Sequence, residues 1–282
     1  SRRVHVEPGV VLDELQQHAA GHGLRFGPDV STSTHATLGG MIANRSAGLH
    51  SLKWGMTDAH VAGVDVVLAS GRRVRLERGA AARDPVVADL TSRVAQVVLP
   101  LADEIDARYP RLRRNVGGYA LDRILNDLRR CSPGSFDEVD LSGLMAGSEG
   151  TLGFLVGADL KLVPTPARTG LSVLAFPDVS AALLVLGVIL EMKPAAIELL
   201  DGSVLAAARR HETYRHLASL LPSLDGGPAE AVLYVDWFAE DDAALERVMS
   251  GLEARLPHVQ IRCCMGEDEQ QDLWRLRKVG LG

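Results

Sequence analysis

The sequence predicts an α+β protein made of two domains. Residues 61–68 and 72–76 are two strand-like runs separated by a Ser-Gly turn, which is typical of a β-hairpin. Beyond residue 166, short apolar strands alternate with segments of helical spacing. Between these regions the Pro-Thr-Pro sequence at 164–166 is stiff and extended, so we place the domain boundary there. The two predicted domains span residues 1–166 and 167–282.

The first domain is expected to contain strands, a hairpin and at least two long helical stretches. Residues 4–7 alternate in polarity before a Pro-Gly turn and predict a strand, and apolar spacing predicts a helix over 11–22. The segment 86–105 has helical spacing but contains Pro100, so we expect a kink or two helices. The remaining expected elements are an inserted loop at 127–138 and a strand at 154–163.

In the second domain strands and helices alternate. Asp178 and Asp241 precede two of the helices and are expected N-caps, because a short carboxylate accepts hydrogen bonds from the first free N–H groups of a helix. The expected strands are 171–176, 196–200, 231–238 and 259–263, and the expected helices are 179–192, a helical stretch through 221, and 241–256.

The composition argues against several classes of protein. The chain has 282 residues and a formal net charge of −6, which argues against a nucleic-acid partner. Apolar runs such as 183–190 are shorter than the ~20 residues that cross a bilayer, so we expect no transmembrane segment. The three cysteines have no metal-binding spacing. We therefore expect a reducing, cytoplasmic setting, free or at the inner face of the membrane.

Residues 28–48 carry the most informative local pattern. Gly39, Gly40, Ala43 and Gly48 surround the amide side chain of Asn44 and follow a run of small hydroxyl residues. Small residues let the backbone approach a ligand closely, and successive N–H groups can face an anion such as a phosphate. A glycine-rich loop is also compatible with a simple turn, so composition alone leaves both interpretations open.

A second glycine-rich segment lies at 147–153 and reads GSEGTLG. Its three glycines bracket Glu149, whose carboxylate can accept hydrogen bonds from the hydroxyls of a ribityl chain or a ribose. Alone this pattern is weak, but its position after the first glycine-rich loop strengthens the interpretation as a ligand-binding segment.

Several stretches follow one another in a recognisable order. They are TLGGMIANRSAG, SLKWG and VAGVDVVLASG within 37–71, RNVGGYALDR at 114–123, GSEGTLG at 147–153 and LWRLRK at 273–278. Together they resemble the FAD-linked D-2-hydroxyacid dehydrogenases of the vanillyl-alcohol-oxidase superfamily. The resemblance implies the second part of an FAD-binding domain followed by a ferredoxin-like substrate domain, an antiparallel sheet with helices on one face. It also implies a longer protein, in which the N-terminal half of the FAD-binding domain precedes this chain and the substrate domain continues beyond it.

The resemblance implies FAD as the cofactor and assigns residues to the site. Arg277 matches the arginine that binds the substrate carboxylate, and a guanidinium suits this role because it forms two parallel hydrogen bonds to a carboxylate. Relatives often carry proline where Val30 stands and asparagine where Arg45 stands, which leaves the detailed shape of the loop open. We assign no catalytic residue and no metal ligand in this chain, because the resemblance implies that the catalytic histidine, often beside a divalent metal, follows the end of this chain. The expected FAD-binding residues are Pro28, Asp29, Thr37, Gly39, Gly40, Asn44, Gly48, Glu149, Gly150, Gly153 and Leu155.

The implied reaction is the oxidation of a D-2-hydroxyacid to a 2-oxoacid, with D-2-hydroxyglutarate and D-lactate as the leading substrates. Hydride passes to FAD. The long insertion and the RNVGGYALDR motif resemble large bacterial members of the family that carry a C-terminal iron–sulfur domain, which implies that the electrons then pass to this domain or to another electron carrier. The alternative is a non-catalytic flavin-fold subunit of a multi-subunit oxidase. A different flavin reaction on the same scaffold is a third option, against which the LWRLRK motif argues.

Several further residues have two interpretations. Trp54 stands where relatives carry tyrosine, and we expect a core aromatic rather than a flavin contact. His60 is expected to be structural. Arg111, Arg113 and Arg114 could hold an acidic substrate or a phosphate, or form a solvated face.

Overall fold

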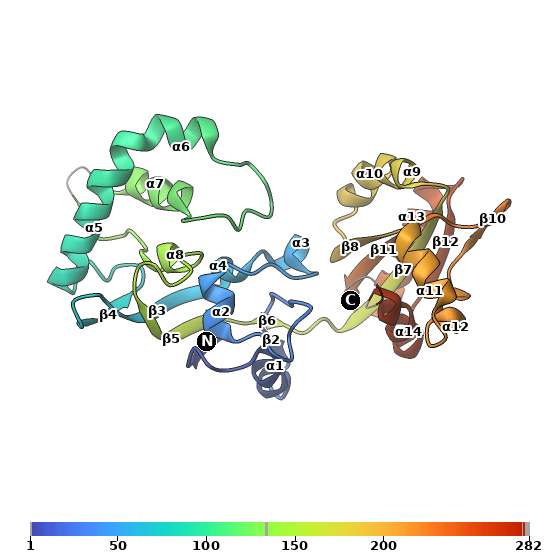
Figure 1. Cartoon of the computed structure of the whole chain (residues 1–282), viewed down its shortest axis with the longest axis horizontal. Helices are drawn as coiled ribbons and strands as arrows, with labels where there is room; N and C mark the ends of the chain where they lie inside the picture. The colour runs from blue at the N-terminus through green and yellow to red at the C-terminus, as the bar shows by residue number, and fades with distance from the viewer. Residues whose placement is uncertain (1, 133–134, 278, 280–282) are drawn as a thin grey trace. The chain divides into compact units, whose positions relative to one another are not determined.

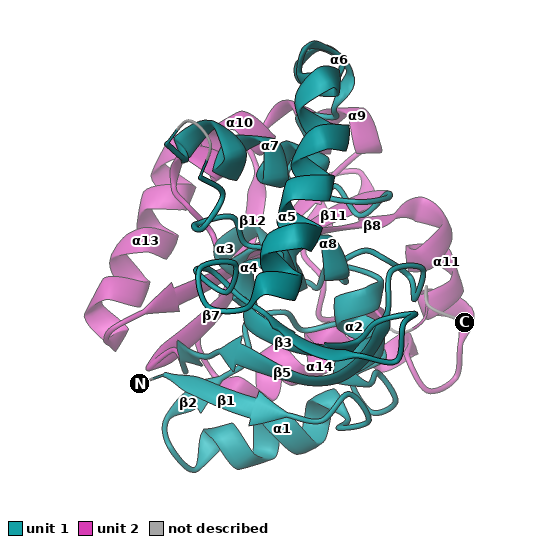
Figure 2. Ribbon diagram, turned by 90° about the vertical axis from the view of Figure 1, so that its left-hand side faces the viewer, with its two compact units in different colours: residues 1–165 teal, residues 166–282 magenta. Residues whose placement is uncertain are grey.

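The structure is a computed structural model that describes residues 2–132, 135–277 and 279. The chain divides into two compact units, Ser1–Thr165 and Pro166–Gly282, which we call unit 1 and unit 2 (Figure 1, Figure 2). Each unit has its own antiparallel sheet and its own buried core. The α+β class predicted from the sequence is confirmed.

Unit 1 combines a four-stranded sheet with helices of very different length. Its strands are β1 Arg3–Val6, β2 Leu24–Arg25, β3 Val61–Val67, β4 Arg73–Leu76, β5 Phe154–Lys161 and β6 Val163–Pro164. Its helices are α1 Leu12–Ala20, α2 Leu38–Ala43, α3 Ser51–Trp54, α4 Thr57–His60, α5 Pro85–Val98, α6 Ala102–Arg108, α7 Leu121–Arg130 and α8 Ser142–Met145, with a 3₁₀ turn, η1, at Leu99–Leu101.

The main sheet of unit 1 has the strand order β1-β5-β3-β4, and all its pairs are antiparallel. The predicted hairpin is confirmed as β3 and β4. Buried and partly buried residues alternate over residues 64–67 of β3, because successive side chains of a strand point to opposite faces of the sheet. Val64 and Val66 enter the buried core, whereas Asp65 lies on the other face, where it pairs with Arg75 at 3.3 Å. One face of this sheet is therefore apolar and the other carries charges.

The long helical stretch of unit 1 bends where the sequence predicts. Asp84 caps α5 by accepting a hydrogen bond from the Val86 N–H at 2.8 Å, and η1 places Pro100 between α5 and α6. The helical stretch 85–108 is long and apolar enough, by length and composition alone, to cross a bilayer. The sequence analysis considered shorter apolar runs and did not test this stretch. The buried face of this stretch, including Val87 and Ile105, packs into the unit 1 core.

The predicted inserted loop at 127–138 is partly wrong. α7 continues through Arg130, because Ile124, Leu125 and Leu128 lie on one side of the helix and are buried in the core. Its Asp127 is held by Arg78, with guanidinium–carboxylate distances of 3.1 Å. Of the proposed loop, positions 133 and 134 lie outside the described residues.

Unit 2 follows the predicted alternation of strands and helices. Its strands are β7 Arg168–Phe176, β8 Ala196–Asp201, β9 Ser223–Leu224, β10 Gly227–Pro228, β11 Ala231–Ala239 and β12 Gln260–Cys264. Its helices are α9 Val179–Leu184, α10 Leu186–Glu191, α11 Gly202–Arg210, α12 Arg215–Ala218, α13 Asp242–Arg255 and α14 Glu267–Arg277. The predicted helix 179–192 is thus two short helices that meet at Val185.

The main sheet of unit 2 has the order β12-β7-β11-β8 with antiparallel pairing throughout, the strand order of a ferredoxin-like fold. The expectation that helices cover one face is wrong. Val173 and Tyr234 contribute to a core with α11, α12 and α14, whereas Leu174 and Leu233 contribute to a second core with α9, α10 and α13. β7 and β11 are therefore apolar on both sides, and a sheet of this kind is stable only when both faces are covered.

Both predicted N-caps of unit 2 are confirmed. Asp178 accepts a hydrogen bond from the Ala181 N–H at 2.8 Å, and Asp241 accepts one from the Ala244 N–H at 2.7 Å. Asp201 caps α11 in the same way, with distances of 2.9 Å to the Ser203 nitrogen and 3.0 Å to the Val204 nitrogen. The Ser203 hydroxyl also donates to the Asp201 carboxylate at 2.6 Å, and this bond, together with the two backbone bonds, lowers the pKa of Asp201 because it favours the ionised form.

Candidate functional site

The two glycine-rich segments, separated by about 100 residues in sequence, lie side by side in unit 1. We call residues 37–48 the first ribbon and residues 147–153 the second ribbon. The Gly147 N–H donates to the Ile42 carbonyl at 3.0 Å, and the Glu149 N–H donates to the Ala43 carbonyl at 3.1 Å. The second ribbon therefore hydrogen-bonds to the last turn of α2, which is part of the first ribbon.

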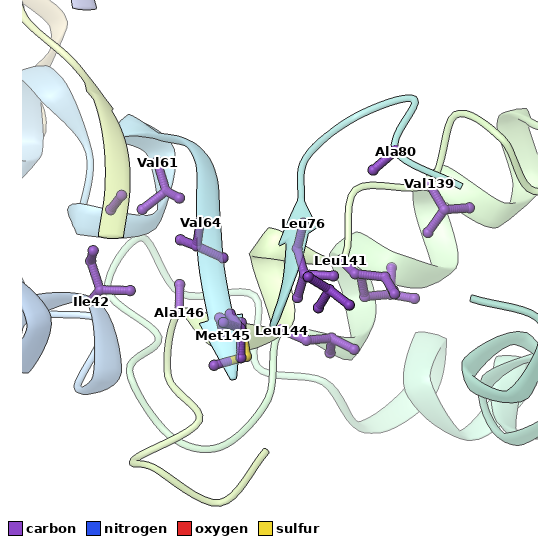
Figure 3. Close-up of a cluster of buried hydrophobic side chains, with 14 of the residues drawn as sticks. Ile42, Val61, Val64, Leu76, Ala80, Val139, Leu141, Leu144, Met145 and Ala146 are labelled. Carbon is purple, nitrogen blue, oxygen red and sulfur yellow. The ribbon is translucent and has the colours of Figure 1, made fainter. Parts of the chain in front are cut away.

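A groove of about 380 Å³ runs along both ribbons. Its floor is apolar: Ile42 and Met145 line it and belong to the buried cluster of unit 1, where Figure 3 shows them with Ala146. Six of the residues expected to bind FAD line this groove, namely Thr37, Gly39, Gly40, Gly150, Gly153 and Leu155. The sequence interpretation missed Pro8, Gly9, Ser148 and Phe154, which line it as well. The Pro-Gly turn at 8–9 was the available signal for two of them.

The glycines of the ribbons serve different purposes. A Cβ on Gly39 would lie 2.6 Å from Pro8 Cβ, one on Gly48 would lie 2.5 Å from backbone atoms of Asp29, and one on Gly153 would lie 2.6 Å from Val66 Cγ1. These three glycines let protein segments cross at close range. Gly150 differs, because a Cβ there would meet nothing within 4 Å and its φ is +78°. Its backbone faces the groove rather than another part of the protein.

Pro28 and Asp29 do not line the groove. Pro28 is buried, and the Asp29 carboxylate accepts a hydrogen bond from the His50 N–H at 2.9 Å and also contacts the His50 ring. Arg25 lies 3.7 Å from the same carboxylate. Asp29 therefore holds the loop that follows the first ribbon, and its position fits a role in shaping the site from within the protein.

Asn44 and Glu149 are exposed at the point where the ribbons meet, and neither lines the groove. Next to Asn44, Arg45 adopts a left-handed φ of +52° and closes α2 in a Schellman motif, with the Ser46 N–H bonded to the Met41 carbonyl at 2.9 Å. Asparagine would tolerate this conformation better than arginine does.

Arg45 forms a buried ion pair that asparagine at this position would not form. Its Nε donates to Asp58 Oδ2 at 2.7 Å, and Arg123 reaches the same oxygen at 2.9 Å. The Arg45 and Asp58 side chains are 3% and 0% exposed. A Cβ added at Gly147 would lie 3.4 Å from Arg45 Cδ. The Arg45 side chain, which starts in the first ribbon, therefore packs against the second ribbon.

The loop between α6 and α7 is attached to both ribbons. Arg114 Nη2 donates to the Gly48 carbonyl at 2.8 Å, and the Tyr119 hydroxyl lies 2.7 Å from Thr151 Oγ1. All three clustered arginines are exposed, and Arg114 also contacts the first ribbon. The cluster does not line the groove.

His60 and Trp54 have protein partners. The two ring nitrogens of His60 lie 3.1 Å from the Lys161 carbonyl and 2.9 Å from the Trp54 carbonyl, which confirms its structural role. Trp54 is half-buried, with the Arg25 guanidinium 4.8 Å from its ring centroid and the His50 ring 5.4 Å away. The expectation of a core aromatic is therefore only partly met.

Arg277 is the last residue of α14 in unit 2, and its Nη2 lies 3.0 Å from Glu198 Oε1 on β8.

Unit 2 also contains two cysteines that are adjacent in sequence, Cys263 and Cys264. Burial raises the pKa of the Cys264 thiol to about 12, and burial also raises the pKa of Cys263. Both side chains are therefore thiols at neutral pH and unsuited to nucleophilic work. The described part of the chain contains no cluster of His, Cys, Asp and Glu that could hold a metal ion.

Two known domain families match this chain. Residues 1–77 match the FAD binding domain, and residues 165–282 match the C-terminal domain of FAD linked oxidases. A D-2-hydroxyglutarate dehydrogenase from Escherichia coli is 30% identical over 260 residues, which are 90% of this chain and 25% of that protein. The same enzyme from Pseudomonas putida is 29% identical over 267 residues, 92% of this chain and 25% of that protein. The chain thus spans about a quarter of the length of these relatives.

Two further comparisons extend these matches. Glycolate oxidase subunit GlcD of Bacillus subtilis is 27% identical over 281 residues, 98% of this chain and 47% of that protein. Two structures of alkyldihydroxyacetonephosphate synthase align with 99% of this chain and with 42% and 43% of theirs. Their TM-scores are 0.60 and 0.61 at 16% and 17% identity, so they show the fold alone.

The groove between the ribbons fits the FAD that the domain matches indicate. An apolar floor suits the flat ring of a flavin, and glycines at 9, 40 and 150 leave its walls without side chains. Within the described residues, the Gly150 N–H has no hydrogen-bond partner, so this donor is open to a ligand. When bound, FAD supplies the redox chemistry.

Proposed function

Because this chain belongs to the vanillyl-alcohol-oxidase-type family of FAD-linked oxidoreductases, we propose that it takes part in oxidising a D-2-hydroxyacid to a 2-oxoacid, with FAD as the hydride acceptor. The observation that carries this proposal is the meeting of the two ribbons at one groove of about 380 Å³. Either ribbon alone would be compatible with a turn, whereas two ribbons on one apolar groove suit a flat ligand.

The FAD-binding residues are proposed in two groups. Thr37, Gly40, Gly150 and Leu155 line the groove, and we assign them direct contact with the cofactor. Gly39 and Gly153 line it too, but they are also needed where protein segments cross. Pro28, Asp29, Asn44, Gly48 and Glu149 complete the set and are assigned to the shape and rim of the site.

The substrate class rests on Arg277 and on the similar proteins. The names D-2-hydroxyglutarate dehydrogenase and glycolate oxidase subunit both denote 2-hydroxyacid chemistry. A guanidinium at the end of α14 suits the carboxylate shared by such acids. D-2-hydroxyglutarate and D-lactate are the first substrates to test. The electrons would then leave through an iron–sulfur domain or a separate carrier, and a cytoplasmic location stays a prediction.

The direct test is reduction of the flavin. The FAD-loaded protein is mixed in a stopped-flow instrument with D- and L-enantiomers of several 2-hydroxyacids, and bleaching of the flavin band is followed. We expect fast bleaching with at least one D-2-hydroxyacid and slow bleaching with its L-enantiomer. Bleaching by no D-2-hydroxyacid would contradict the proposal and would favour the non-catalytic subunit.

The role of Arg277 is tested in the same assay with Arg277→Met. We expect the KM for the best D-2-hydroxyacid to rise by about tenfold or more, because a charged hydrogen-bond partner of the carboxylate is lost. Arg275→Met is the matched control: it lies on the same helix, is 59% exposed and pairs with Asp272 at 3.0 Å. An unchanged KM in Arg277→Met would remove its assigned role.

A further inference from the structure

Arg277 is held by one partner, Glu198. The ion pair joins Arg277 Nη2 and Glu198 Oε1 at 3.0 Å, and the two side chains are 27% and 24% exposed. Within the described residues, no other ion pair or hydrogen bond of the Arg277 side chain is found. The guanidinium therefore keeps most of its N–H groups available, while one end of it is fixed.

The fold brings these two residues together from opposite sides of one core. Glu198 and Leu200 lie two residues apart on β8, so both point to the same face of the sheet. Leu200 belongs to the core that also contains Leu273 and Leu276 of α14. Glu198 therefore projects toward the face that α14 covers, next to the end of that helix where Arg277 lies.

The helix that carries Arg277 is itself fixed to the sheet. Tyr234 of β11 is paired directly with Glu198 and its hydroxyl donates to the Leu273 carbonyl at 3.0 Å. This buried hydroxyl stays protonated, because burial raises the pKa of Tyr234 well above its ordinary value. Sheet, helix and ion pair thus form one rigid support for the guanidinium.

We propose that Glu198 is a positioning residue that holds Arg277 in the orientation that receives the substrate carboxylate. This inference rests on the function proposed above. A free arginine side chain loses rotamer entropy when it is immobilised, so a guanidinium that is already fixed binds a carboxylate at lower entropic cost. Glu198 contacts one nitrogen and leaves the other edge of the planar group for a second carboxylate.

The test compares Glu198→Ala and Glu198→Gln in the FAD-loaded protein, using the D-2-hydroxyacid that bleaches the flavin fastest. We expect Glu198→Ala to raise the KM by about tenfold with kcat changed by less than about twofold, because binding and not the chemical step is weakened. Glu198→Gln keeps an oxygen that accepts from Arg277 and should recover part of the lost affinity. A residue that only supports the fold would not give this division between KM and kcat or this rescue.

A matched control removes a similar ion pair elsewhere in unit 2. Glu191 pairs with Arg255 at 3.1 Å, so Glu191→Ala deletes an arginine–glutamate pair that is more exposed than the Arg277–Glu198 pair, and it should leave the KM unchanged. Binding of oxalate to the oxidised protein, measured by calorimetry, gives a second readout without turnover. We expect oxalate affinity to fall in Glu198→Ala and Arg277→Met and to stay constant in Glu191→Ala.

The outcomes separate this inference from the proposed function. If Arg277→Met raises the KM and both Glu198 variants leave the KM and oxalate affinity unchanged, Glu198 has no positioning role, whereas the function stands. If Arg277→Met itself changes neither quantity, the assignment of Arg277 fails and the role of Glu198 fails with it. A loss of affinity in Glu191→Ala equal to that in Glu198→Ala would also overturn the inference.

Discussion

Both units are built on a four-stranded antiparallel sheet, but the two sheets are covered differently. In unit 1, Val64 and Val66 face the core while Asp65 faces a group of charged side chains on the other side. In unit 2, β7 and β11 contribute to a separate apolar core on each face. The candidate FAD groove belongs to the unit whose sheet has a single core.

The difference teaches where each unit is sensitive. Unit 1 shapes its groove by close crossings of backbone, such as Gly48 against Asp29 and Gly39 against Pro8. Unit 2 depends on large side chains buried on both sides of its sheet, with Tyr234 and Leu174 fully buried. We therefore expect that enlarging a crossing glycine disturbs the groove of unit 1, and that truncating a buried side chain lowers the stability of unit 2.

The largest effect is expected from Gly48→Ala in unit 1. The new Cβ would lie 2.5 Å from backbone atoms of Asp29, and a backbone cannot yield as a flexible side chain does. The two segments must separate, so we expect FAD affinity, measured by titration of flavin fluorescence, to fall at least about tenfold. Gly187→Ala in unit 2 is the control, because a Cβ there meets nothing within 4 Å. Equal FAD affinity in both variants would contradict the importance of the crossing.

The next effect is expected from Leu174→Ala in unit 2. Leu174 is 0% exposed in one of the two cores, and truncation of a buried leucine costs about 2–5 kcal/mol of the free energy of unfolding. Leu184→Ala, at a residue 84% exposed, should cost little. Denaturant unfolding measures both changes. A large loss in Leu174→Ala together with unchanged FAD affinity would sharpen the contrast between the units.

A smaller effect is expected at the start of α13. Asp241→Ala removes the side chain that accepts from the Ala244 N–H at 2.7 Å, and loss of an N-cap costs about 1 kcal/mol. Asp241→Asn keeps a capping oxygen and should retain most of the stability. The thermal midpoint distinguishes the two variants, and equal losses would show that the cap is not the cause.

The smallest effect is a pH dependence confined to the charged face of the unit 1 sheet. Burial raises the pKa of Asp159, but the hydrogen bond from His5 and the charge and hydrogen bond of Arg75 outweigh it, so this pKa lies below its ordinary value. A lowered folded-state pKa adds stability that is present above the unfolded pKa of about 4 and is lost as the pH falls through the folded value. The thermal midpoint of the wild-type protein should therefore decline below about pH 4 more steeply than that of Asp159→Asn. Parallel declines would exclude Asp159 as a source.

The sequence alone predicted features that depend on neighbouring residues. The hairpin of β3 and β4, the break at Pro100 and the caps at Asp178 and Asp241 are all confirmed. Each depends on a turn, a missing N–H or a short carboxylate acting within a few residues. The order of the family motifs likewise indicated FAD, in agreement with the domain matches.

Tertiary structure decided which residues meet across long distances in the chain. It brought the second ribbon against α2, made Gly39, Gly48 and Gly153 necessary for backbone crossings, and covered both faces of the unit 2 sheet. It also paired Arg277 with Glu198. Local pattern carries no information about such contacts, because they depend on how distant segments pack and on which atoms then come within a few ångströms of each other.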